Sequence, residues 1–66
     1  MLALERRNQI LEQLQREKRV VVSELSAFFG VSEETIRRDL EKLSEDGFVI
    51  KTYGGAVLNE DNVVDM

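Results

Sequence analysis

The chain has 66 residues, which is the size of one small domain. It contains neither Cys nor His, so disulfides, thiolate nucleophiles, imidazole bases and the usual zinc sites are excluded, and we expect no enzyme, metal or cofactor. Apolar runs such as residues 20–22 and 27–29 are far too short for a membrane span or a signal peptide, so we expect a cytoplasmic protein. The net charge of -4 argues against a nucleic-acid partner, because proteins that bind a duplex usually have a basic surface.

The acidic residues are spread unevenly along the chain. Three of the thirteen lie in the last eight residues with no basic residue beside them, so residues 1–58 hold ten acidic and nine basic residues. This part of the chain is close to neutral. The placement of its charges therefore matters more than their sum.

The first part of the chain predicts an amphipathic helix. Leu4, Ile10, Leu11 and Leu14 recur at spacings of three, four and seven residues, with mostly charged and amide side chains between them. The charged stretch 16–19 ends this pattern. The β-branched triplet 20–22 that follows suits a short strand, which needs a partner strand elsewhere in the chain.

A second helix is predicted before Gly30. We expect Ser23 to cap it, because a Ser oxygen can accept from the first free N–H groups of a helix. Gly30 stands where the helix must end with a positive φ angle, and Ser32 is placed to cap the next helix. The inward side of the second helix would be formed by Val22, Leu25, Phe28 and Phe29.

The third helix is expected to carry Ile36, Leu40 and Leu43 inward and to end at Gly47. Two helices joined by about three residues that include a Gly are typical of a helix-turn-helix. Phe48, placed to contact Leu43, is expected in the core with Phe28 and Phe29.

The C-terminal part, residues 48–58, predicts a β-hairpin, which is the wing of the fold. Residues 48–52 and 56–58 are β-prone runs on either side of Gly54 and Gly55, which we expect to supply the positive φ angles of a tight turn. The strand at 20–22 would pair with this hairpin. Residues 59–66 are acidic and lack periodicity, which predicts a linker or tail after a domain of residues 1–58. The predicted fold is mainly α with a small antiparallel sheet, a three-helix winged helix-turn-helix.

Three stretches carry a resemblance to a known family. They are Arg6, Ile10 and Leu14 in the first helix, the run SEETIRRDL at residues 32–40, and GGA at residues 54–56. Together they resemble the N-terminal domain of the DeoR family of bacterial regulators over about residues 6–58. The hexapeptide TIRRDL within the second stretch is a much narrower signal than a general helix-turn-helix pattern.

The resemblance implies a repressor that binds double-stranded operator DNA, usually of operons for sugar or nucleoside utilisation. It also implies a larger C-terminal domain, outside these residues, that senses a phosphorylated sugar and forms homo-oligomers. Members of the family often have His where this chain has Tyr53. Because both side chains can hydrogen-bond to phosphate, the difference leaves the wing prediction in place and affects only its contacts.

An α-helix fits the major groove, and the second helix of this motif points the side chains of its N-terminal half at base edges. At about 100° per residue, Glu34 and Arg38 point directly away from the inward residues. We expect Arg38 to bind a guanine edge, and Ser32 and Thr35 to bind phosphate. The complete set of predicted DNA-binding residues is Ser32, Glu34, Thr35, Arg37, Arg38 and Lys42 on the helix, with Lys51, Tyr53, Gly54 and Gly55 in the wing.

The same surface has a plainer interpretation, a solvated helix face held by the i,i+4 pairs 33–37, 34–38 and 37–41. Arg38 beside Lys42 favours DNA, because a like-charge i,i+4 pair is unfavourable on a free surface. Asp39 lies near the core edge and is expected to bind an arginine of the first helix. Arg16, Lys18 and Arg19 form either a phosphate contact or a solvated loop. The alternative function is a protein-interaction winged helix, which would need an exposed apolar strip.

Overall fold

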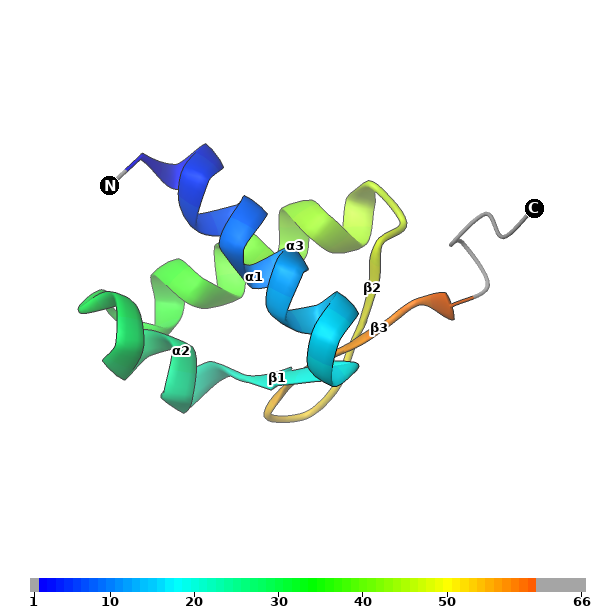
Figure 1. The fold of residues 1–66 in the computed structure, drawn as a ribbon. Helices are drawn as coiled ribbons and strands as arrows, with labels where there is room; N and C mark the ends of the chain where they lie inside the picture. The colour runs from blue at the N-terminus through cyan, green and yellow to red at the C-terminus, as the bar shows by residue number, and fades with distance from the viewer. Residues whose placement is uncertain (1, 61–66) are drawn as a thin grey trace.

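The computed structural model describes residues 2–60, so residues 61–66 of the predicted acidic tail lie outside the described part. The elements, in chain order, are α1 (Ala3–Glu17), β1 (Arg19–Val21), α2 (Val22–Phe29), α3 (Glu33–Glu45), β2 (Val49–Lys51) and β3 (Gly55–Leu58). Figure 1 shows α1 crossing over α3, with the strands near the C-terminal end of α1. This arrangement confirms the predicted fold class. No helix in residues 2–60 is long and apolar enough to cross a membrane.

The sheet has the strand order β1-β3-β2, and both pairings are antiparallel. Val20 lies opposite Ala56 in one pair, and Ile50 lies opposite Val57 in the other. The first strand therefore pairs with the wing, as the sequence predicted. It begins and ends one residue earlier than predicted.

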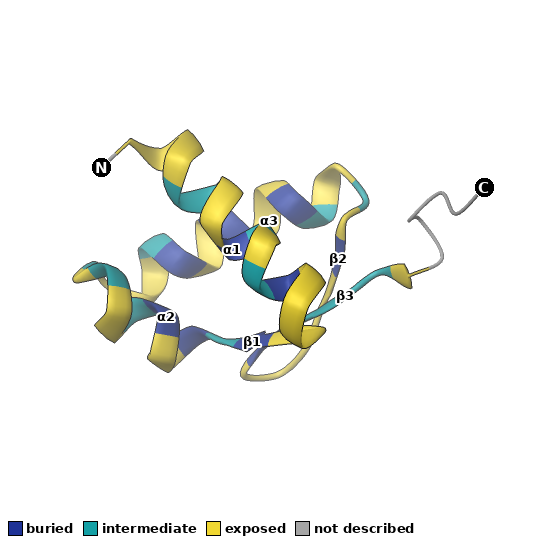
Figure 2. Cartoon of the chain, in the orientation of Figure 1, coloured by how far each residue is buried: buried dark blue, intermediate teal, exposed yellow. Residues whose placement is uncertain are grey.

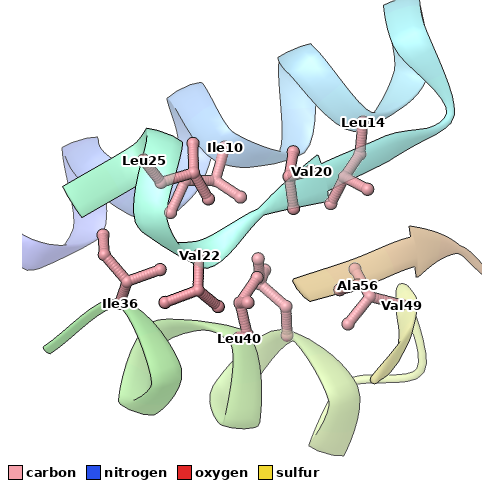
Figure 3. Packing of buried hydrophobic residues seen from close by; sticks show 10 residues of the cluster. Ile10, Leu14, Val20, Val22, Leu25, Ile36, Leu40, Val49 and Ala56 are labelled. Carbon is pink, nitrogen blue, oxygen red and sulfur yellow. The ribbon is translucent and has the colours of Figure 1, made fainter. Parts of the chain in front are cut away.

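The core is a single cluster to which every helix and strand contributes. Figure 2 shows the buried residues as stripes on the inward sides of the helices, and Figure 3 shows the side chains of α1, α2 and α3 meeting those of the strands. Burial of these side chains against one another is the main stabilising contribution to the fold. The buried apolar residues are Ile10, Leu14, Val20, Val22, Leu25, Ile36, Leu40, Leu43, Val49 and Ala56.

The start of α2 differs from the prediction. The helix begins at Val22, and its N-cap is Val21, which has no side-chain oxygen to offer. The backbone N–H of Val22 instead donates to the carbonyl oxygen of Gly54 in the wing, at 2.9 Å. The prediction that Ser23 caps this helix is wrong, because a tertiary contact from the wing satisfies one of the free N–H groups.

The prediction that all three phenylalanines lie in the core is also wrong. Phe28 is 76% exposed and Phe48 41% exposed, whereas Phe29 packs partly buried against the core. At about 100° per residue, Phe28 lies about 100° around α2 from Phe29, outside the stripe that Val22 and Leu25 form. Its ring contacts Phe29 edge-on, with the centroids 5.0 Å apart.

The wing turn uses its two glycines differently from the prediction. Positive φ angles occur at Gly30 (68°) and Gly47 (85°), as expected for helix ends, and neither Gly54 nor Gly55 has one. A Cβ on Gly55 would lie 2.0 Å from the carbonyl oxygen of Val20, whereas a Cβ on Gly54 would meet nothing within 4 Å. Gly55 is therefore required because β1 passes so close to β3, which a local turn pattern does not reveal.

Hydrogen bonds close the C-terminal end of α3 and join it to the end of the wing. Past α3, the N–H of Gly47 donates to Ser44 and the N–H of Phe48 to Leu43, which closes the helix in a Schellman motif. α1 ends at Glu17, and its C-cap Lys18 adopts a φ of 75° although it is not a glycine. At the far end of the wing, Asn59 donates from its backbone to Phe48 and from its side chain to Gly47. Asn59 thus joins the end of the wing to the turn that follows α3.

Candidate nucleic-acid interface

The turn between α2 and α3 sets where the third helix begins. Ser32 is the N-cap of α3, and its Oγ accepts a hydrogen bond from the N–H of Thr35 at 3.2 Å. The Oγ atoms of Ser32 and Thr35 are also 3.0 Å apart and hydrogen-bonded to each other. This cap was predicted from the sequence, and it holds both hydroxyl groups at the exposed start of the helix.

The outward face of α3, meaning the side bearing Glu34, Arg37, Arg38, Glu41 and Lys42, points into solvent as predicted. The Arg38 side chain is 77% exposed and that of Glu34 is 74% exposed. Arg37 is 61% exposed, and Thr35 is half-buried at the rim. The inward residues Ile36 and Leu40 are buried, so the helix separates a core side from a charged side.

Ion pairs connect most of the charges on the outward face. Arg37 donates to Glu33 and Arg38 donates to Glu34, each at 3.2 Å. The third pair considered from the sequence, Arg37 with Glu41, is not among the ion pairs of residues 2–60, because Glu41 binds Lys51 of β2 instead. This last pair joins the outward face to the first strand of the wing.

Asp39 lies at the edge of the core side of α3, next to the outward face, where it is 3% exposed. Its carboxylate accepts two hydrogen bonds from the guanidinium group of Arg6 in α1, and Arg7 lies 3.6 Å from it. The hydrogen bond to Asp39 raises the pKa of Arg6 above its ordinary value despite the burial of this group, so Arg6 stays charged at neutral pH. The predicted link between Asp39 and an arginine of the first helix is confirmed.

A groove of about 520 Å³ runs along the outward face of α3, between this helix, the N-terminal half of α1 and the end of β2. Six of the nine basic residues of the chain line it. Four acidic residues, Glu34, Asp39, Glu41 and Glu45, line it as well, so the groove has a net charge of +2 in a chain whose net charge is -4. This local excess of cations weakens the objection that the net charge raised against DNA binding. The six basic residues are Arg6, Arg7, Arg37, Arg38, Lys42 and Lys51.

Arg6 and Arg7 are the two basic residues of this groove that the predicted DNA-binding set did not include. They belong to α1, outside the helix-turn-helix, and the crossing of α1 over α3 brings that helix beside the groove (Figure 1). The signal available in the sequence was the predicted link between Asp39 and the first helix. That link would have placed the neighbouring arginine beside the outward face.

The predicted wing residues do not all lie on one surface. Lys51 lines the groove with α3, whereas Gly54 and Gly55 line a separate hollow beside β1. Tyr53 is fully exposed, and Gly54 is exposed while its carbonyl oxygen accepts from Val22. Gly55 is buried in β3, so its amide does not form part of an open tip as expected. The basic loop residues Arg16, Lys18 and Arg19 are exposed but do not line the groove.

The fold and the cation-lined groove along its third helix define a winged helix-turn-helix domain that binds DNA. The family model for the DeoR-like helix-turn-helix domain matches residues 6–62. The chain belongs to this family, which consists of DNA-binding regulators of transcription.

Several curated proteins resemble the chain. An uncharacterised HTH-type transcriptional regulator of Bacillus subtilis strain 168, YulB, is 49% identical over 57 residues, which cover 86% of this chain and 22% of that protein. A putative aga operon transcriptional repressor of Escherichia coli O157:H7 is 46% identical, over 82% of this chain and 20% of that protein. The glycerol-3-phosphate regulon repressor of Escherichia coli K12 is 38% identical, over 96% of this chain and 25% of that protein. The chain therefore spans about a quarter or less of the length of these relatives. No solved structure gives a significant match.

Proposed function

We propose that the chain is the operator-reading domain of a bacterial transcriptional repressor and that the outward face of α3 enters the major groove. The observation that carries this proposal is the gathering of six of nine basic residues, against four of the thirteen acidic ones, along one groove of an acidic protein. Such a surface supplies the attraction to phosphate that supports both specific and non-specific binding. A helix of 13 residues whose N-terminal half has one exposed, charged face has the shape that the major groove accepts.

The contacts follow from the position of each side chain. Arg38, the most exposed arginine of the outward face, is proposed to bind the O6 and N7 atoms of a guanine. Arg37 and Glu34 flank it, and Glu34 can accept from a cytosine amino group. The remaining contacts are with the sugar-phosphate backbone, from Ser32, Thr35 and Lys42 on α3 and from Lys51, Tyr53 and Gly54 in the wing.

The regulated genes are proposed from the relatives. Two of them are named as repressors of the aga operon and of the glycerol-3-phosphate regulon, which supports a repressor of sugar or sugar-phosphate metabolism. Recognition of a phosphorylated sugar inducer and homo-oligomerisation are assigned to parts of the whole protein outside these 66 residues, because the chain matches only 20 to 25% of the length of these relatives. The domain itself contributes DNA reading and no chemistry.

Selection of bound duplexes from a random pool tests this function. The domain is expected to enrich one short sequence and then to bind it more tightly than random duplex in a salt titration. Binding of the isolated domain is expected to be weak, because two helix-turn-helix domains of a dimer normally bind one operator together, at half-sites about 34 to 36 Å apart. Equal affinity for all duplexes would contradict sequence-specific reading, and a complete lack of DNA binding would favour the protein-interaction alternative.

A further inference from the structure

Arg38, the arginine proposed to bind guanine, already has an ion-pair partner in the free protein. The Nη2 atom of Arg38 donates to Oε2 of Glu34 at 3.2 Å, and both side chains are about three-quarters exposed. Lys42 stands one turn further along the helix and repels Arg38 toward Glu34. Within residues 2–60, Lys42 itself has no ion-pair partner, so the geometry gives Arg38 one carboxylate on one side and one like charge on the other.

We infer that Glu34 is a specificity-determining residue because it acts as a built-in counterion that keeps Arg38 from binding phosphate. The inference rests on the function proposed above. A phosphate of random DNA offers Arg38 an acceptor of the same charge as the one it already has, so the exchange gains little. A guanine edge offers two acceptors in the geometry of the guanidinium fork, which the single hydrogen bond to Glu34 does not provide.

The consequence is an effect that depends on the DNA sequence. At the operator, Arg38 is engaged by guanine whether or not Glu34 carries a charge. On random duplex, an Arg38 freed from Glu34 has only phosphates to bind, and each such contact releases counterions. Loss of the Glu34 charge should therefore strengthen binding to random duplex by one phosphate contact. On the operator, no phosphate contact should be added.

The pair between Glu41 and Lys51 provides the internal comparison. Lys51 is a proposed phosphate contact on any duplex, so its release from Glu41 strengthens that contact to a similar degree on the operator and on random duplex. Neutralising Glu41 should therefore raise both affinities and leave their ratio unchanged. Glu45 lines the same groove but has no ion pair within residues 2–60, so its neutralisation alters the local charge without freeing a cation.

The test measures the affinity of the unmodified domain and of the Glu34→Gln, Glu41→Gln and Glu45→Gln variants for the selected operator and for random duplex, between about 50 and about 200 mM salt. For Glu34→Gln on random duplex, the slope of log K against log salt should steepen by about 0.9, the value for one added phosphate contact. Its affinity relative to the unmodified domain should then change about three- to fourfold across that range, with no such steepening on the operator. Glu41→Gln should steepen both slopes equally, and thermal unfolding confirms that each variant is folded.

Two results would overturn the inference. An unchanged slope for Glu34→Gln on random duplex would show that Glu34 does not restrain Arg38. This is the result expected if Glu34 only contacts cytosine, because loss of that contact does not change the number of phosphate contacts. An equal steepening for Glu45→Gln would show that only the net charge of the groove matters. If the unmodified domain prefers no DNA sequence, both the proposed function and this inference are wrong. If the domain prefers the operator but either of the two results above is found, only this inference is wrong.

Discussion

The two sides of α3 carry the same kind of ion pair with different consequences. On the inner side, Asp39 is 3% exposed and holds Arg6, whose side chain is 11% exposed. On the outer side, Glu34 and Arg38 form a pair with both side chains more than 70% exposed. Exposed pairs contribute little to stability because water screens them, and removal of one partner of a buried pair leaves an uncompensated charge. Burial therefore assigns the inner pair to the fold and leaves the outer pair free to exchange partners with DNA.

The largest effect is expected from Asp39→Ala. The substitution leaves the mostly buried Arg6 without its acceptor and should lower the free energy of unfolding by about 3 kcal/mol or more. Glu34→Ala, the matched change on the outer side, should lower it by only about 0.5 kcal/mol or less. Urea unfolding of both variants measures the difference, and equal losses would show that burial does not separate the two pairs.

The glycines of the wing extend the comparison from charge to packing. Gly55→Ala places a methyl group against the backbone of Val20 and should cost about 1 to 3 kcal/mol, because backbone atoms must move apart. Gly54→Ala meets no atom and takes no positive φ, so it should change the stability by about 0.5 kcal/mol at most. Thermal unfolding distinguishes them. A similar shift in both variants would contradict the close approach of β1 and β3.

Arg38→Ala should affect binding and leave the fold intact. Loss of a bidentate contact to guanine should weaken operator binding by about 1 to 3 kcal/mol, with a much smaller loss on random duplex. Its stability should change by about 0.5 kcal/mol or less, because the pair with Glu34 is exposed. Fluorescence titrations on both duplexes test this. Equal losses would reduce Arg38 to a phosphate contact.

The parts of the fold that local chemistry determines were predictable. The cap at Ser32, the positive φ angles at Gly30 and Gly47, and the inward stripe through Ile36 and Leu40 each depend on a few neighbouring residues. The orientation of Glu34 and Arg38 followed from helix geometry alone, once that stripe was known.

Most of the wrong predictions concern contacts between segments that are distant in the chain. Ser23 is not a cap because Gly54 reaches the start of α2, and Gly55 is required by the approach of β1. Phe28 is exposed because it lies outside the stripe of α2 that packs on the core, which hydrophobicity alone did not indicate. Arg7 joins the groove only through the crossing of two helices. Local patterns specify elements and their faces, and the tertiary arrangement decides which faces meet.

The most direct test of DNA reading by α3 is a nuclear magnetic resonance titration of the isotope-labelled domain with the selected duplex at low ionic strength. The signals of Thr35, Arg38 and Lys42 on the outer side of α3 are expected to move most, and those of Phe28 on α2 to stay in place. Signals of α3 that remain unmoved with every duplex, or changes centred on Phe28, would contradict the account.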